Sequence, residues 1–284
     1  MKKTLKLSII ILNLLLMLTL SCGTKTEKIE KDYVLVEDDD GILVEKFDST
    51  IIDENRFNHN NEVFKVGNSF KYDFEHRTTS GEIKYFKIHP DFKGWDFVDA
   101  DDTDSLIVKS VVIQVMNGNP IAQFIPDYNQ TALAYILIEG VPFSMSGAIE
   151  NEANIWIHPP REHYFKILEL NPFPYIKAPY EKGTKWNWNL TIGNSYADKR
   201  WKTWENTIEN NYQYEITNKV LLETALGNLQ CYVIESEAES RIGTTALTAY
   251  FHPKYGFVKL DYTNIDGSKT MLELTKHLTN KPGN

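Results

Sequence analysis

A regular succession of short strand-like segments fills the second half of the chain and limits the fold more than any other feature. Turns rich in glycine and asparagine separate these segments, as at 226–228 and 264–268. Strands joined by such short links pair antiparallel, because no crossover helix is available. The six predicted strands are residues 185–192, 212–220, 229–236, 244–251, 257–263 and 270–274. We therefore expect a mainly β fold of curved antiparallel sheets.

The first half shows the same strand pattern with one exception. Residues 33–36 and 42–44 flank a turn and predict a hairpin, and a β-branched run over 106–116 predicts a long strand. Alternating aromatic residues predict two paired strands on either side of the turn at 79–81. Residues 129–139 are apolar nearly all round and end before glycine and proline, which predicts one short buried helix.

Two aromatic motifs recur along the chain and suggest two related β units. The matching segments are Gly67-x-x-Phe70-x-Tyr72 with Gly183-x-x-Trp186-x-Trp188, and 155–159 with 249–253, each of the latter pair followed by a predicted aromatic strand, 164–170 or 255–262. Coincidence among the 35 aromatic residues is the alternative. A stiff proline-rich segment at 171–179 separates the copies. We predict a first β unit over 33–175, with the helix inserted, and a second over 176–284.

The N-terminus has the form of a secretory signal peptide. Three lysines precede an apolar run from Leu7 to Leu20 that is too short to span a bilayer, so residues 1–21 are predicted to be removed. The run ends in Leu18-Thr19-Leu20-Ser21-Cys22-Gly23, which resembles the lipobox of bacterial lipoproteins, although Leu20 and Thr19 depart from the usual residues. The resemblance implies that Cys22 carries lipid such as palmitate and that 22–32 form a tether. Cleavage nearby without lipidation is the alternative.

Charge and composition narrow the location and the partners. The chain has 30 basic and 39 acidic residues, and loss of the signal peptide leaves a net charge of −12. Such an acidic body argues against nucleic acid as a partner and against electrostatic attachment to anionic lipid, so the lipid anchor would hold it on the membrane. Gly23 stands where an aspartate would resemble an inner-membrane retention signal. We therefore expect the outer membrane, on its periplasmic or its surface side.

No motif for a metal or a cofactor is present in the sequence. With Cys22 lipidated, Cys231 has no partner in the chain, and its strand-like surroundings favour a packing role. The acidic run at 37–40 lacks the ligand spacing of a calcium loop, and the run at 99–104 lacks the glycine that such a loop requires. His158 and His163 are five residues apart, and the two prolines between them exclude a helix, so their spacing is poor for zinc. We predict no metal and no cofactor.

Two groups of residues are candidates for ligand binding. His158 and Arg161 lie in a short polar segment after a predicted strand, and Arg161 is the group expected to meet an anionic ligand. A turn in which His158 bonds to backbone is the structural alternative. Trp201 and Trp204 alternate with lysine and arginine, which is typical of an exposed aromatic platform, with core packing as the alternative. The carboxylates available for catalysis, none of them singled out by its neighbours, are Glu169, Glu205, Glu235, Glu237 and Asp261.

Three segments within residues 180–275 carry a resemblance to a known group of proteins: Glu223–Gly227, Cys231–Ile234 and Tyr255–Leu260. Through these segments this part of the chain resembles uncharacterised bacterial cell-envelope β domains. In that group a curved antiparallel sheet resembles the periplasmic lipoprotein carriers, which implies a half-open sheet with an apolar concavity and brings no catalytic residues. We expect a lipid-anchored envelope protein that binds a lipid, a glycan or a protein partner without chemistry. The alternatives are an envelope hydrolase that acts on polysaccharide or peptidoglycan through a carboxylate pair, and a structural component of an envelope assembly.

Overall fold

The computed structural model describes residues 32–38, 41–47, 53–141 and 143–279. The predicted signal peptide, the lipidation site at Cys22 and the tether up to residue 31 lie outside these ranges. From Tyr33 onwards the chain forms one compact unit. Within the described ranges, no helix is long and apolar enough to cross a bilayer.

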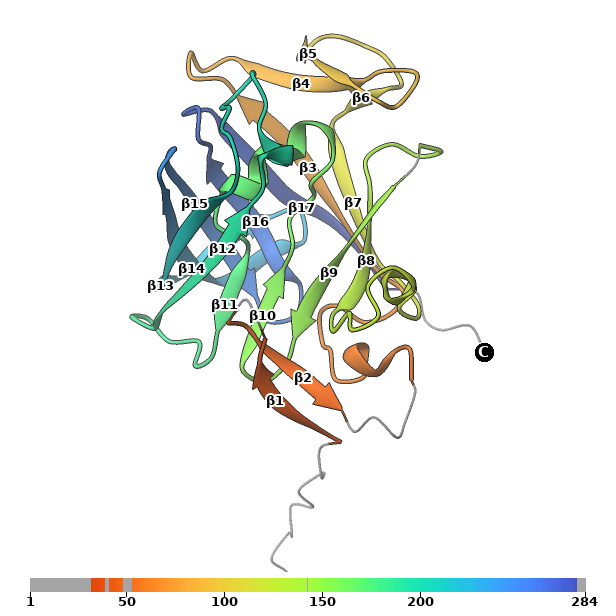
Figure 1. The fold of residues 1–284 in the computed structure, drawn as a ribbon, viewed down its shortest axis with the longest axis vertical. Coiled ribbons are helices and arrows are strands. Elements are labelled where there is room, and N and C mark those ends of the chain that lie inside the picture. Colours follow the sequence, from red (N-terminus) through yellow and green to blue (C-terminus); the bar gives the residue numbers. More distant parts are fainter. Residues whose placement is uncertain (1–31, 39–40, 48–52, 142, 280–284) are drawn as a thin grey trace, which may run out of the picture. The chain divides into compact units, whose positions relative to one another are not determined.

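The compact unit is built almost wholly of antiparallel strands (Figure 1). The predicted N-terminal hairpin is present as a separate two-stranded sheet, β1 (Tyr33–Glu37) and β2 (Leu43–Phe47). All other described strands belong to one sheet, whose main path runs β11-β10-β9-β8-β7-β3-β17-β16-β15-β14-β13-β12, with β4, β5 and β6 attached beside β3. These strands are β3 (Asn68–Arg77), β4 (Ile83–Ile88), β5 (Trp95–Asp99), β6 (Ile107–Val108), β7 (Ser110–Val115), β8 (Thr131–Ile136), β9 (Ser144–Glu150), β10 (Asn154–Ile157), β11 (Tyr175–Lys177), β12 (Lys185–Ile192), β13 (Ile208–Thr224), β14 (Gly227–Ser240), β15 (Gly243–His252), β16 (Gly256–Thr263) and β17 (Lys269–Thr279).

The main sheet curves until its two edge strands face each other. Trp186 and Trp188 on β12 alternate with exposed polar residues and pair in register with Tyr214 and Tyr212 on β13. The rings of Trp186 and Tyr214 stack at 5.2 Å, and Tyr175 on the opposite edge strand β11 comes within 5.6 Å of Trp186. The prediction of a mainly β fold with curved antiparallel sheets is therefore confirmed, as are all six strands predicted in the second half.

The helix predicted over 129–139 is wrong, because that segment forms the central strand β8. β8 lies between β7 and β9, and every residue from Thr131 to Tyr135 is buried. A strand buried on both faces loses the alternation of polar and apolar residues that identifies strands in sequence. A short buried helix does occur in the first half. It is the 3₁₀ helix η3 (His163–Leu170), where the repeat predicted an aromatic strand.

The proposed boundary between residues 175 and 176 falls inside β11, and strands from both proposed units share the main sheet. β3 from the first unit pairs with β17 from the second over most of its length. Part of the repeat has a structural counterpart, since Gly67 and Gly183 both adopt positive φ just before an inward-facing aromatic strand. The other motif does not recur in structure, because its first copy leads into η3 and its second into β16.

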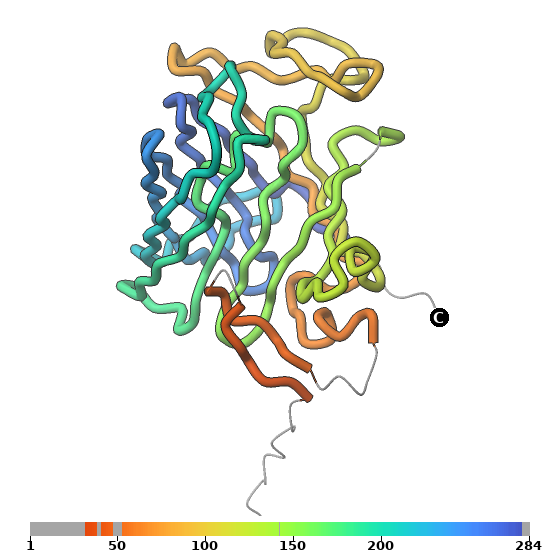
Figure 2. Tube along the Cα trace, in the orientation of Figure 1, coloured from red at the N-terminus to blue at the C-terminus, as the bar shows by residue number. Residues whose placement is uncertain are grey.

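Helix η3 packs against the concave side of the main sheet. Its buried residues include Tyr164, whose hydroxyl lies 2.6 Å from Thr270 Oγ1 on β17 and 2.8 Å from His76 Nδ1 on β3. At its other end, the carbonyl of Leu170 accepts hydrogen bonds from Asn210 Nδ2 at 3.0 Å and Thr245 Oγ1 at 2.7 Å. Both ends of η3 are thus held by the sheet, and the chain path from β10 through η3 to β11 is visible in Figure 2.

In the described ranges, three shorter 3₁₀ helices lie in connections between strands. They are η1 (Arg56–Asn58), η2 (Pro120–Gln123) and η4 (Asn194–Tyr196). η2 precedes β8, and η4 follows β12 directly. The segment around η2 therefore lies between β7 and β8 in the chain, and η4 lies at the end of the edge strand β12.

Candidate functional site

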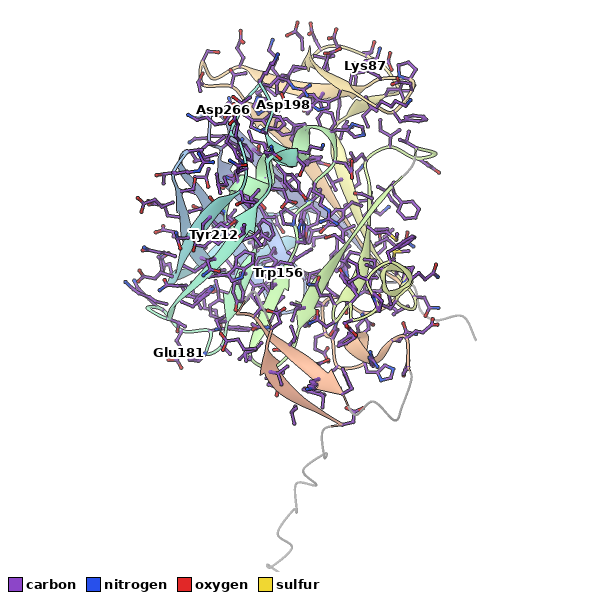
Figure 3. All side chains as sticks on the ribbon, in the orientation of Figure 1. Lys87, Trp156, Glu181, Asp198, Tyr212 and Asp266 are labelled. Atoms are coloured by element: carbon purple, nitrogen blue, oxygen red, sulfur yellow. The ribbon has the colours of Figure 1, made fainter. Side chains whose placement is uncertain are left out.

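A cavity of about 530 Å³ lies where the closing sheet is incomplete. β11 has only three residues and pairs with β10 from Asn154 to Trp156, and β11 and β12 are the two ends of the sheet path, which do not pair with each other. The cavity is lined from β9, β10, η3, β12 and the segment around η2. Trp156, labelled in Figure 3, is its contribution from β10.

Aromatic and aliphatic side chains make most of the cavity wall. The rings of Trp156 and Trp188 meet edge to face at 6.0 Å, and Phe173 lies 5.2 Å from Trp188. At the edge of the cavity, Phe124 and Ile125 are 76% and 53% exposed, so the cavity reaches the surface. The other apolar and aromatic lining residues are Ile121, Tyr128, Met145, Leu190, Ile192 and Tyr196. Such a wall suits the apolar body of a small organic molecule.

Besides two tyrosines, the described lining of this cavity contains three ionisable side chains: His158, Arg161 and Glu169. The side chain of Glu169 is only 4% exposed, and its Oε1 lies 3.4 Å from Nε2 of His158. That distance is longer than an ordinary hydrogen bond, and Glu169 Oε1 has no hydrogen-bond partner among the described residues. This buried carboxyl oxygen is therefore available to a polar group that enters the cavity.

Hydrogen-bond geometry fixes the proton on His158. Its Nδ1 lies 2.7 Å from the carbonyl oxygen of Pro159, which can only accept, so Nδ1 donates and carries the proton. Burial lowers the pKa of His158 to about 3, an effect that the charge of Arg161 reinforces, so the ring is neutral at neutral pH. Nε2 therefore presents a lone pair to the Glu169 carboxyl.

Glu169 is pushed towards its protonated form. Burial raises the pKa of Glu169 to about 7, although the positive charge of Arg161 opposes the shift. A protonated carboxyl can donate to the Nε2 lone pair of His158, whereas an ionised one would place two lone pairs against each other. The geometry and the burial therefore agree on a neutral Glu169 near His158 below pH 7.

Arg161 keeps its charge without a carboxylate partner. Its polar contacts are a 3.5 Å approach of Nη2 to the Met145 carbonyl and a hydrogen bond with the Tyr196 side chain, and it forms no ion pair within the part of the chain that the structure describes. Arginine is always protonated and its planar fork matches carboxylate and phosphate groups. With Glu169 and His158 neutral, the cavity of this acidic protein is positively charged.

The structure brings together two of the four predicted ligand-binding residues. His158 and Arg161 both line the cavity, and the bond from His158 to Pro159 shows that the turn alternative is present as well. Trp201 and Trp204 are 7% and 8% exposed and do not line it. Trp201 stacks on Trp95 at 6.2 Å, and its Nε1 donates to the Tyr196 carbonyl. These two rings pack in the core cluster.

Sequence reasoning named Glu169 without singling it out, and among the tryptophans between residues 156 and 204 it favoured Trp201 and Trp204 over the lining residues Trp156 and Trp188. Glu169 stands between Leu168 and Leu170, and a lone carboxylate in an otherwise apolar buried segment was the available signal. Glu205, Glu235, Glu237 and Asp261 do not line the cavity. Across the described ranges, no three His, Cys, Asp or Glu side chains are grouped so that they could hold a metal ion.

The chain matches no protein-family model, and no curated protein matches it in sequence. Solved structures of bacterial proteins that are described as lipoproteins or as exported are similar to it. A candidate lipoprotein from Parabacteroides distasonis is 10% identical, with 76% of this chain and 97% of that one covered and a TM-score of 0.43. An exported protein with a YmcC-like fold from Bacteroides fragilis is 9% identical, with coverages of 76% and 97% and a TM-score of 0.38. The hypothetical lipoprotein YmcC from Escherichia coli is 8% identical, with coverages of 75% and 86% and a TM-score of 0.34. Values this low support no inference about the function of this chain.

Gly147 on β9 keeps one wall of the cavity in place, and Gly147→Ala tests this. A Cβ at this position would lie 2.1 Å from both Tyr128 Oη and Gln130 Oε1, two side chains that hydrogen-bond to each other at 3.0 Å. We expect the alanine variant to break that bond and to lose about 1–2 kcal/mol of unfolding free energy, measured by urea denaturation. Gly193→Ala is the control, since its Cβ would meet only Ser195 Oγ at 3.8 Å. Equal stability of the two variants would contradict the prediction.

Proposed function

We propose that this protein is a binding protein of the bacterial cell envelope that holds a small, largely apolar molecule in the cavity between β10 and β12. The observation that supports the proposal is the cavity itself, which has aromatic walls, an exposed apolar edge and a buried carboxyl oxygen without a partner. Its volume of about 530 Å³ is in the range of small-molecule sites.

Attachment to the membrane is part of the proposal and rests on the sequence. The lipobox-like segment ending in Cys22 supports lipidation, and Gly23 supports the outer membrane rather than the inner one. A lipid chain contributes about 0.8 kcal/mol per buried CH₂, so several chains would hold the protein on the membrane. Uptake of labelled palmitate by the wild type and its loss in Cys22→Ser is the expected result. Labelling that persists in the variant would refute the anchor at this residue.

Within this cavity, the lining favours binding over hydrolysis. A carboxylate-pair hydrolase needs two carboxyl groups at the reacting bond. Among the described residues that line the cavity, Glu169 is the one carboxylate. The hydrolase stays a sequence-based alternative that the cavity does not favour.

Native mass spectrometry tests the proposed function. The sheet and the core lie within residues 33–279, so the soluble body 24–284 is the protein to purify from its own cells. We expect an excess mass of small-molecule size that disappears on denaturation. Trp188→Ala, which removes one cavity wall, is expected to lose the excess mass, whereas Trp204→Phe, away from the cavity, should keep it. A wild-type mass equal to that of the bare chain would contradict a tightly held ligand.

A further inference from the structure

The polar side chains of the cavity comprise one cation and several neutral groups, and this combination indicates the charge of its ligand. Arg161 is the basic residue of the lining, and the carboxyl of Glu169 and the ring of His158 are both held neutral by burial and by their mutual geometry. Gln130, Ser146 and Thr191 add uncharged hydrogen-bonding groups. A neutral ligand that displaces water from the cavity would leave the half-buried guanidinium of Arg161 without a counterion, which is unfavourable.

We infer that the cavity binds an amphiphilic monoanion, a carboxylate with an aromatic or aliphatic body, whose head group pairs with Arg161 and whose binding requires Glu169 to be protonated. This inference rests on the proposed function, because it names the ligand class of the same cavity. The body of the anion lies against Trp156, Trp188 and Phe173, three aromatic residues of the same lining that contact one another.

When its carboxyl is ionised, Glu169 competes with the anionic ligand for the charge of Arg161. When ionised, its carboxylate neutralises Arg161 and repels an incoming carboxylate. The charged and titratable groups that face Glu169 from the surrounding elements are His158 after β10, Arg161 in the following loop, Tyr196 in η4 and Tyr212 on β13. His158 and the two tyrosines stay neutral between pH 6 and 8.5, because burial lowers the pKa of the histidine and raises those of the tyrosines. Glu169 is therefore the group in this set whose charge changes in that interval.

The test compares 1-naphthaleneacetate with its neutral amide as probes, with calorimetry on the body 24–284 at pH 6 and pH 8.5. For the wild type we expect the acid to bind at least about tenfold more tightly than the amide at pH 6, because only the acid pairs with Arg161. Its affinity should fall by about 30-fold at pH 8.5, since a carboxyl with a pKa near 7 must then be protonated for binding. The affinity of the amide should not change with pH.

Two variants assign these effects to residues. Glu169→Gln cannot ionise, so the acid should bind with the same affinity at both pH values. Arg161→Met should lose the preference for the acid and keep the affinity for the amide. The matched controls are Glu237→Gln and Arg77→Met, which remove the same charges from exposed positions on β14 and β3 and should behave as the wild type.

The outcomes separate the inference from the proposed function. Equal binding of acid and amide to the wild type would overturn the monoanion and leave the cavity as a binding site for neutral molecules. A pH dependence that persists in Glu169→Gln would overturn the role of Glu169. Failure of both probes to bind would also overturn the inference, and the mass of the ligand found by native mass spectrometry would then decide the proposed function alone.

Discussion

Glu150→Ala is expected to lose about 3–5 kcal/mol of unfolding free energy, the largest effect of any single substitution considered for this protein. Glu150 ends β9 and is 7% exposed. Its Oε1 accepts hydrogen bonds from the backbone N–H groups of Glu62 at 2.7 Å and Val63 at 2.9 Å, and its Oε2 accepts one from Phe64 at 2.8 Å. Removing the carboxyl leaves three N–H groups without acceptors, each worth about 1–3 kcal/mol when fully buried.

Residues 62–64 need this carboxyl because they belong to no strand, so their backbone N–H groups have no strand partner to accept their hydrogen bonds. Val63 and Phe64 are buried, and the segment leads into β3 through Gly67. Urea denaturation of Glu150→Ala beside Glu62→Ala measures the effect. The second variant removes an exposed carboxylate and keeps the backbone N–H, so it should stay within about 0.5 kcal/mol of the wild type. A loss below about 1 kcal/mol in Glu150→Ala would contradict the structural role.

Strands that bury one face were predictable from the sequence, and strands that bury two were not. On β12 and β13 the aromatic residues point inward and polar residues point outward, so the alternation was visible and both strands were found. On β8 the core residues Leu133 and Tyr135 alternate with the equally buried Ala132 and Ala134, and the resulting apolar run has no period that distinguishes a strand from a helix. Gly140, which follows this run, was interpreted as the end of a helix and so supported the wrong prediction.

The candidate site was predictable only in part, because it is formed by closure of the sheet. His158 and Arg161 are three residues apart and stood out in sequence as charged groups after a strand. Trp188 lies on β12, the other edge strand of the main sheet, and lines the same cavity. No pattern of neighbouring residues in the sequence predicts that these side chains meet. Trp201 and Trp204 suggested an exposed platform because exposed Lys199 and Lys202 lie beside them, yet the rings turn inward while the lysines face solvent.

The second large effect is a change in pH dependence. We expect Glu169→Gln to alter the slope of the unfolding free energy with pH more than its value at any one pH. The pKa of Glu169 is raised by burial from 4.5 to about 7, so its contribution to stability is complete below pH 4.5 and is lost as pH rises through 7. The pKa of His158 is lowered by burial from 6.5 to about 3, so its contribution is complete above pH 6.5 and is lost as pH falls. Between pH 4.5 and 6.5 the two contributions have opposite slopes.

In the wild type these slopes cancel, and the pair adds little pH dependence in that interval. In Glu169→Gln only the His158 contribution remains, so the unfolding free energy of the variant should rise by about 3 kcal/mol relative to the wild type between pH 4.5 and 6.5. Urea denaturation of both proteins across this interval measures the difference, and other titrating groups cancel in it because both proteins share them. Glu237→Gln, on the exposed face of β14, should follow the wild type throughout. A difference that stays constant with pH would mean that Glu169 is ionised in the folded protein, and the positively charged cavity would then be neutral.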